Sequence, residues 1–276
     1  MGLLRQVKDK LNAGEEVLSN KARFTQSKVS SVDSVGMMAL TVYGDTLSQP
    51  TRAVVLLCLA NKIPYELKVA DFTKKEHKLP EFKELNPRSE VPVIDDGGFI
   101  LAESTTILRY IASSRHLSDH WYPTEVKSRA RVDYLLDWYH SNIHQTAEYV
   151  FQKELVTNLW KEPIPPEEII KAAEQRMIAS MDLVEGCFLK PEKGPFLLGA
   201  SEPSIADIIF ACEYTQTRFL VHPEQEKLMH ERPKTMKWLD TVEKRLAPYF
   251  GEAHKTLPDL IMAAEFHRAS LRITES

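Results

Sequence analysis

The chain has 276 residues, of which 43% are hydrophobic and 27% are charged, as is typical of a globular protein with one large domain or two modest ones. Its 35 basic and 39 acidic residues leave a formal net charge of −4, so electrostatics favour neither nucleic acid nor an anionic membrane, and we expect a small-molecule partner. The longest uninterrupted apolar run, residues 53–60, is far too short to cross a bilayer, so an integral membrane protein is not expected.

Residues 1–38 differ from the rest of the chain because they are rich in Ser and Lys and carry few apolar side chains. Leu4, Val7 and Leu11 follow helical spacing beside basic residues, which leaves a short amphipathic targeting helix open as an alternative. Acidic residues such as Asp9 are atypical of a transit peptide. We therefore interpret residues 1–38 as a flexible N-terminal extension.

The segment 39–115 alternates strand and helix patterns. Its first helical stretch is apolar on nearly every face, as expected for a helix packed between a sheet and a second domain. The order βαβ, α, ββα resembles a thioredoxin-like domain. The predicted elements are strands at 40–43 and 65–70, helices over 48–61 and 80–85, strands at 91–94 and 99–101 around the turn Asp95-Asp96-Gly97-Gly98, and a helix over 103–114.

Two features of this segment point to a bound peptide. Pro92 lies at the start of a predicted strand, where it belongs either at a sheet edge or in a cis turn, and both alternatives leave the backbone of Val91 free to pair with an extended peptide. Glu103 and Ser104 begin a predicted helix, whose hydroxyl and bare N–H groups suit a carboxylate. Together the two features predict a site for an extended peptide that carries a carboxylate.

We interpret residues 116–125 as a linker and residues 126–270 as an all-α domain, so the fold class is α+β. Two apolar stripes predict amphipathic helices, and further helices are expected over 234–246 and 256–268. Ser204 and Asp207 have the spacing of a capping box, so we expect Asp207 to be structural rather than catalytic. The stripes comprise Val132, Leu135, Leu136, Tyr139 and Ile143, and Ile170, Ala173, Met177, Met181, Val184 and Phe188.

The three cysteines bear on the cellular compartment. Cys58, Cys187 and Cys212 form no Cys-x-x-Cys pair and lie within apolar helical patterns. This arrangement predicts buried thiols in a reducing compartment. We therefore expect a cytoplasmic protein.

The first strand-to-helix turn contains Ser48-Gln49-Pro50-Thr51-Arg52. A serine followed two residues later by proline is a good helix start on local grounds alone. In a thioredoxin-like domain, however, this turn faces the proline loop, so the Ser48 hydroxyl would point at the sulfur of a peptide paired with Val91. A hydroxyl that donates to a thiolate lowers the pKa of the thiol, and the helix N-terminus adds to the effect.

These motifs, in this order, resemble the glutathione-binding half of the soluble glutathione transferases, and the segments 47–53, 120–123 and 129–132 resemble the theta class. The resemblance covers roughly residues 39–268. It implies a homodimeric enzyme that uses glutathione as co-substrate, without a metal. The reaction it implies is conjugation of small hydrophobic electrophiles, with reduction of organic hydroperoxides as a possible second activity.

The resemblance also implies roles for single residues. Ser48 would activate the thiol, and Arg52 would help to hold the active-site turn. The electrophile would lie against the helical domain beside Tyr139 and His144. The glutathione-binding residues would be Gln49, Arg52, His77, Lys78, Glu90, Val91, Pro92, Glu103 and Ser104.

Glu90 departs from the family pattern. Ser89-Glu90 stands where the family usually has Gly-Lys, so Glu90 would repel a glutathione carboxylate unless Arg88 or Lys78 compensates. Glu90 also leaves open a non-catalytic carrier or interaction protein with the same fold. The intact Ser48 favours the enzyme.

His144 is the second departure, because theta relatives commonly place Arg near the sulfur at this position. We therefore expect a different substrate range. His140 and His144 are four residues apart on a predicted helix, a spacing that suits a metal, but no third ligand is evident. We predict no metal site.

Overall fold

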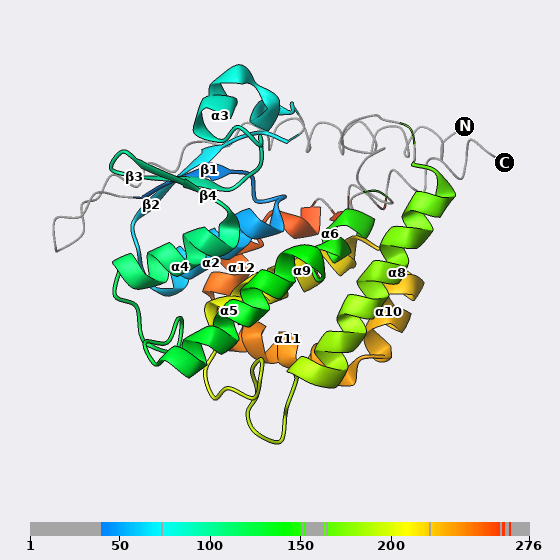
Figure 1. The fold of residues 1–276 in the computed structure, drawn as a ribbon. Coiled ribbons are helices and arrows are strands. Elements are labelled where there is room, and N and C mark those ends of the chain that lie inside the picture. The colour runs from blue at the N-terminus through cyan, green and yellow to red at the C-terminus, as the bar shows by residue number, and fades with distance from the viewer. Residues whose placement is uncertain are drawn as a thin grey trace.

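The computed structural model describes residues 40–259, apart from residues 73, 151, 153–162, 164 and 221, together with residues 261, 262 and 265. The predicted extension over residues 1–38 lies outside the described residues. Part of the predicted helix over residues 256–268 lies outside them as well. Figure 1 shows a twisted sheet with helices on both faces, set against a larger helical assembly.

The N-terminal part contains a mixed four-stranded sheet in the order β2-β1-β3-β4. Strand β1 pairs parallel to β2 and antiparallel to β3, and β3 forms a hairpin with β4. This topology confirms the predicted thioredoxin-like domain. The elements are β1 (Leu40–Gly44), α2 (Gln49–Ala60), β2 (Tyr65–Val69), η1 (Glu76–Lys78), α3 (Pro80–Leu85), β3 (Val93–Asp96), β4 (Phe99–Ala102) and α4 (Ser104–Ser114).

The peptide bond between Val91 and Pro92 is cis and immediately precedes β3, which is an inner strand. Of the two alternatives for Pro92, the cis turn is therefore correct and the sheet edge is wrong. The hairpin turn uses Gly97 and Gly98, which both have a positive φ that favours glycine. The proline loop lies at the β3 start, the same end of the sheet as the loop that enters α2.

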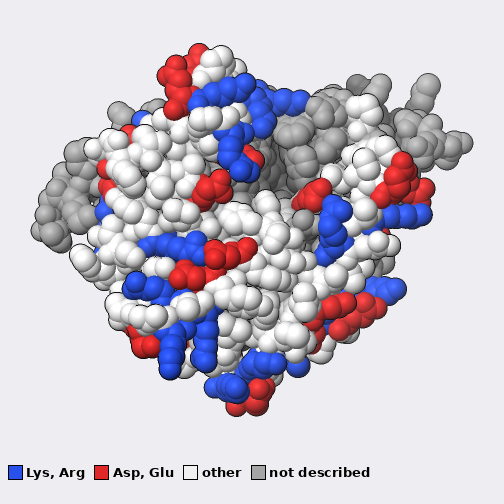
Figure 2. All heavy atoms as spheres, viewed as in Figure 1, with Lys and Arg blue, Asp and Glu red and all other residues white. Residues whose placement is uncertain are grey.

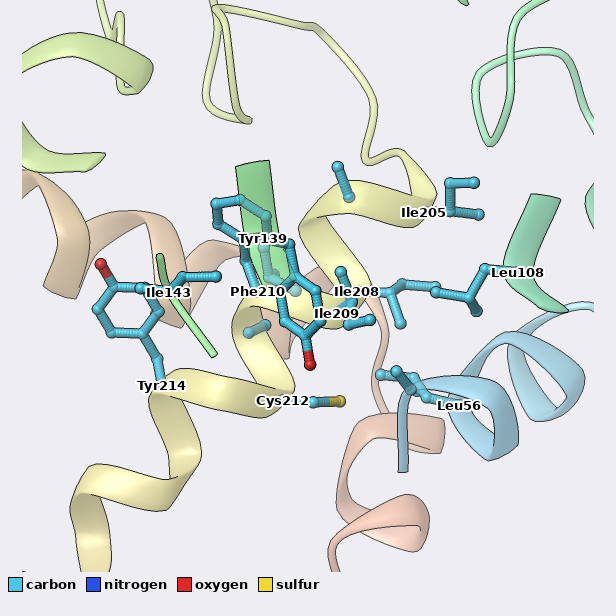
Figure 3. Close-up of a cluster of buried hydrophobic side chains, with 14 of the residues drawn as sticks. Leu56, Leu108, Tyr139, Ile143, Ile205, Ile208, Ile209, Phe210, Cys212 and Tyr214 are labelled. Atoms are coloured by element: carbon cyan, nitrogen blue, oxygen red, sulfur yellow. The ribbon is translucent and has the colours of Figure 1, made fainter. Parts of the chain in front are cut away.

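Helix α2 is buried along most of its length, because it lies between the sheet and the helical domain. It contacts α4, α9 and α12. Leu56 from α2, Leu108 from α4 and Ile208 from α9 meet in one apolar cluster (Figure 3). The nearly all-round apolar pattern of this segment predicted this position.

The C-terminal part is helical. We propose that residues 116–125, the predicted linker, form the boundary between it and the N-terminal domain. Its described elements are α5 (Val126–Ser141), α6 (Gln145–Val150), α8 (Glu167–Leu183), the π-helix η3 (Val184–Phe188), α9 (Ile205–Tyr214), the 3₁₀ helix η4 (Thr215–Phe219), α10 (His222–His230), α11 (Pro233–Arg245) and α12 (Tyr249–Ala253).

Helix α5 ends earlier than the apolar stripe predicted. Asn142 breaks it, because the Asn142 side-chain amide donates to the carbonyl of Trp138 at 2.9 Å and its backbone leaves the helical conformation. His140 therefore lies on α5, whereas His144 lies in the turn before α6. The prediction that these two histidines share one helix face is wrong.

Cys58 and Cys212 are buried as predicted, but Cys187 is exposed. Cys187 lies in the π-helix η3, which follows α8 directly. A π-turn has more residues per turn than an α-helix, so the α-helical spacing used for the prediction assigns the wrong side to this residue. The apolar residues Val184 and Phe188 remain on the buried side.

The capping box at the start of α9 is confirmed. One oxygen of Asp207 accepts from the backbone N–H and the hydroxyl of Ser204, at 2.9 and 3.0 Å. The other accepts from the N–H of Leu197 at 3.0 Å and from the indole of Trp238 at 2.9 Å. Asp207 is fully buried and thus joins the start of α9 to α11 and to the preceding loop.

We expect Asp207→Ala to lower the free energy of unfolding by about 3 kcal/mol, because it leaves several buried donors without an acceptor. Urea unfolding of the variant and the wild type measures this difference. Asp207→Asn, which keeps the shape and part of the acceptor set, should lose less. A loss below about 1 kcal/mol for the alanine variant would contradict the structural role.

Candidate active site

A cavity of about 630 Å³ lies between the loops of the N-terminal domain and helices α5 and α6. Figure 2 shows that basic and acidic side chains are interspersed on this face of the molecule. The cavity contains every predicted site residue except Arg52. These residues are Ser48, Gln49, His77, Lys78, Glu90, Val91, Pro92, Glu103, Ser104, Tyr139 and His144.

Ser48 is the N-cap of α2, and its side-chain oxygen accepts from the N–H of Thr51 at 3.3 Å. The Ser48 side chain also lines the cavity, although only 6% of the residue is exposed. Asp45 fixes the turn by accepting from the backbone of Leu47 at 2.9 Å and of Phe72 at 3.2 Å. The Ser48 hydroxyl hydrogen donates to no group among the described residues, so it is available to a molecule in the cavity.

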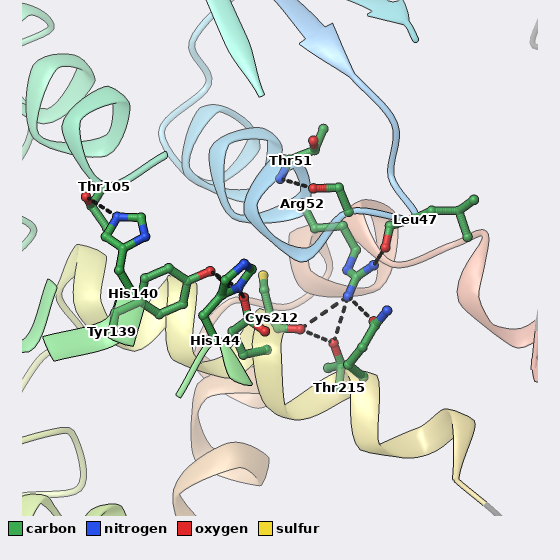
Figure 4. Close-up of polar contacts among 12 residues, drawn as sticks. Leu47, Thr51, Arg52, Thr105, Tyr139, His140, His144, Cys212 and Thr215 are labelled. Carbon is green, nitrogen blue, oxygen red and sulfur yellow. Dashed lines mark hydrogen bonds and ion pairs between the residues drawn. The ribbon is translucent and has the colours of Figure 1, made fainter. Parts of the chain in front are cut away.

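Arg52 lies behind the cavity wall and is completely buried. Its guanidinium donates to the carbonyl of Leu47 at 3.0 Å (Figure 4). The same group donates to the carbonyl of Thr46 at 2.7 Å, and the two bonds hold the turn that carries Ser48. It also donates to the carbonyl of Cys212 at 3.2 Å and to the side chain of Gln216 at 2.8 Å. Burial lowers the pKa of Arg52 to about 10, so the guanidinium stays charged at neutral pH.

The start of α4 also lines the cavity. Glu103 has a positive φ of 68°, which is uncommon for a residue with a side chain, and it provides no side-chain cap for the helix. Ser104 follows as the first helical residue and is buried. The first-turn N–H groups of α4 therefore lack a side-chain acceptor from the N-cap and can receive a carboxylate.

From the sequence, Arg88 was named only as a residue that could compensate the charge of Glu90. The structure places Arg88 beside Glu90. Its guanidinium donates to both oxygens of Glu90, at 3.0 and 3.2 Å, and lies 3.7 Å from the carboxylate of Glu103. Asn86 holds this loop, because its amide donates to the carbonyl of Glu90 at 2.8 Å. The negative charge of Glu90 at the cavity is thus largely balanced by Arg88.

His77 lies on the same side of the cavity, with its ring centroid 4.6 Å from that of Phe72. Burial, helped by the positive charges of Lys78 and Lys75, lowers the pKa of His77 to about 4. The imidazole is therefore neutral at physiological pH.

Tyr139 and His144 form the helical side of the cavity, together with His140. Glu213 on α9, a residue that the sequence reasoning missed, accepts from the Tyr139 hydroxyl and from Nδ1 of His144, the latter at 2.8 Å. The His140 ring lies 3.2 Å from the Thr105 hydroxyl (Figure 4). The available signal for Glu213 was an acid that follows the apolar run Ile208–Cys212 within α9 and has no capping role, unlike Asp207 at the start of that helix.

Within the described chain, no group of three or more His, Cys, Asp or Glu side chains is arranged to hold a metal ion. None of the described helices is both long and apolar enough to span a membrane.

Known proteins resemble the chain in sequence and fold. The family model for the glutathione S-transferase N-terminal domain matches residues 38–113. Glutathione S-transferase T1 of Arabidopsis thaliana is 37% identical over 223 residues, which cover 80% of this chain and 90% of that protein. Bovine glutathione S-transferase theta-1 is 34% identical over 224 residues, covering 80% and 89%. Human glutathione transferase theta-2, in complex with glutathione and an unknown ligand, matches with a TM-score of 0.72 at 31% identity, covering 82% and 90%.

The chain therefore belongs to the glutathione S-transferase family, and within it to the theta class. The relatives that it matches carry the name glutathione S-transferase.

Proposed function

We propose that the Ser48 hydroxyl stabilises the thiolate of bound glutathione and that this thiolate attacks a hydrophobic electrophile held against α5 and α6. The observation that carries the proposal is a single cavity that joins Ser48, the cis Val91-Pro92 loop and the start of α4. A donor at the sulfur favours the charged form of the thiol, and the N-terminus of α2 adds a favourable dipole.

The glutathione backbone would pair with Val91, and its γ-glutamyl carboxylate would lie at Ser104. Support for this orientation comes from the uncapped first turn of α4 and from the cis bond that precedes β3. Gln49, His77, Lys78 and Pro92 line the remaining wall. Arg52 holds the Ser48 turn from behind and does not contact the peptide.

Arg88 should decide the affinity for glutathione. We expect Arg88→Gln to raise the KM for glutathione about tenfold, because Glu90 and Glu103 would then repel its carboxylates without compensation. Glu90→Gln should have the opposite sign and lower the KM, because Arg88 becomes free to attract a carboxylate. Steady-state kinetics with varied glutathione distinguishes these results. An unchanged KM in both variants would contradict a role for this pair.

Turnover separates the enzyme from a carrier with the same fold. We expect the wild-type chain to conjugate glutathione to 4-nitrobenzyl chloride and to be retained on immobilised glutathione until free glutathione is added. Retention without turnover of any halide or hydroperoxide would favour the non-catalytic carrier. Organic hydroperoxides form the second substrate class that we propose.

We further propose a homodimer in the cytoplasm, on the basis of the family relationship and of three cysteines that form no disulfide. Sedimentation at micromolar protein concentration tests the assembly, since a monomer there would remove the dimer from the proposal.

A further inference from the structure

A buried carboxylate holds a histidine at the wall of the cavity. Glu213 is 0% exposed, and its Oε1 atom accepts both from Nδ1 of His144, at 2.8 Å, and from the hydroxyl of Tyr139. The Tyr139 hydroxyl lies 3.1 Å from the same ring nitrogen (Figure 4). A buried carboxylate that accepts from Nδ1 fixes the orientation of the ring and stabilises its protonated form.

The other ring nitrogen of His144 is available to a substrate. The side chain of His144 is 43% exposed and lines the cavity that also contains Ser48. Its Nε2 atom makes no hydrogen bond with the described part of the chain. Because Nδ1 is committed to Glu213, a proton that His144 gives to a substrate leaves from Nε2.

We propose that His144 is a general acid whose Nε2 donates a proton to the oxygen that leaves from an organic hydroperoxide, with Glu213 as its positioning residue. This inference rests on the proposed function, in which the glutathione thiolate is the nucleophile. The inference adds His144 as a catalytic residue. The substrates that need His144 are those with poor, basic leaving groups.

The thiolate attacks the terminal oxygen of the hydroperoxide, so the S–O bond forms and the O–O bond breaks. The electron pair of the broken bond stays on the alkoxide, which takes the proton from His144 and leaves as an alcohol. The sulfur is oxidised to a sulfenic acid, while the peroxide is reduced. A second glutathione then gives the disulfide and water, and His144 regains a proton from solvent.

The surroundings of His144 favour its charged form. Burial lowers the pKa of His144, but the charge of Glu213 and the hydrogen bond to it outweigh burial, so the net shift is upward from 6.5. More of the imidazole is therefore protonated at neutral pH than in a free histidine. The groups that face it are Tyr139 and His140 on α5, Glu148 on α6, Glu213 on α9, Glu90 in the loop before β3, and Arg52 behind Glu213.

The pH dependence follows from this direction. A donated proton is present below the raised pKa and is lost as the pH rises through it. The wild-type kcat/KM for cumene hydroperoxide should therefore rise with thiolate formation and then fall at higher pH. The same profile for 4-nitrobenzyl chloride should lack the falling limb, because a chloride ion leaves without a proton.

The test compares these two substrates in His144→Gln. We expect kcat for cumene hydroperoxide to fall about 100-fold and its falling limb to disappear, while kcat for 4-nitrobenzyl chloride changes less than about threefold. His230→Gln, an exposed histidine at the end of α10, should leave both substrates unchanged. Equal losses for both substrates, no loss for either, or a wild type that does not reduce the hydroperoxide would overturn the proposal.

A second measurement does not depend on turnover. Histidine titration by nuclear magnetic resonance should give His144 a pKa above 6.5, and Glu213→Gln should lower that pKa. An unchanged pKa in Glu213→Gln would overturn the positioning role. Ser48→Ala distinguishes a failure of the proposed function from a failure of this inference. If Ser48→Ala leaves the turnover of both substrates unchanged while His144→Gln still lowers only that of the hydroperoxide, the role of Ser48 fails and the role of His144 stands.

Discussion

Replacing Ser48 with alanine is expected to lower kcat/KM for 4-nitrobenzyl chloride by about 10- to 100-fold at neutral pH. The reason is that a hydrogen bond to a charged group contributes about 1.5–3 kcal/mol, and the thiolate would lose that stabilisation. The loss should shrink as the pH rises, because the thiol then ionises without help. Steady-state kinetics over a range of pH measures both effects.

The matched control for Ser48→Ala is a variant that removes the N-cap of another helix. Ser48 caps α2, so the alanine variant should also lose about 1 kcal/mol of stability. Ser204 caps α9 in a comparable way, through a bond from the N–H of Ala206 at 3.2 Å. Ser204→Ala should therefore lose stability but keep its turnover. A Ser48→Ala variant that is as active as Ser204→Ala would contradict the activating role.

Replacing Arg52 with alanine should have the largest effect on stability, a loss of about 3–5 kcal/mol. Its buried guanidinium joins the Ser48 turn to the end of α9, and its removal takes this donor away from the carbonyls of Thr46, Leu47 and Cys212. Arg52→Lys should recover only part of this loss, because an ammonium cannot reach both sides at once. Urea unfolding measures the change.

Arg232 provides the comparison that separates stability from site geometry. It is also buried, and it donates to the carbonyl of Leu228 at 2.7 Å and to Asp182 at 2.6 Å, but it does not line the cavity or hold its turn. Arg232→Ala should destabilise the chain without changing the KM for glutathione of the folded fraction. Arg52→Lys should raise that KM. Equal KM values in both variants would contradict the role of Arg52 at the turn.

Features encoded by neighbouring residues could be predicted from the sequence. The Ser48 cap, the glycine turn of the hairpin and the Ser204–Asp207 capping box each depend on side chains within a few positions of one another. The apolar character of residues 53–60 likewise predicted a helix packed between the sheet and the helical domain. The order of the predicted strands and helices then indicated the thioredoxin-like domain, and the residues of the cavity were predicted from the resemblance to the glutathione transferases.

Features that depend on distant residues or on altered helix geometry could not be predicted in the same way. Glu213 and His144 are 69 positions apart in the sequence, so the sequence alone does not indicate that they form a hydrogen bond. The end of α5 at Ser141 depends on a side-chain bond of Asn142, and the exposure of Cys187 depends on a π-turn. The sequence left open whether Arg88 or Lys78 compensates Glu90, because two opposite charges that are two residues apart can point away from each other.

The ultraviolet absorbance of the thiolate of bound glutathione, followed against pH in the wild type and in Ser48→Ala, tests the central claim most directly. We expect the wild type to lower the thiol pKa clearly below that of free glutathione, and Ser48→Ala to return it toward the free value. A saturated wild type without a thiolate signal, or an equal pKa in the two proteins, would contradict the proposal that the Ser48 hydroxyl activates glutathione.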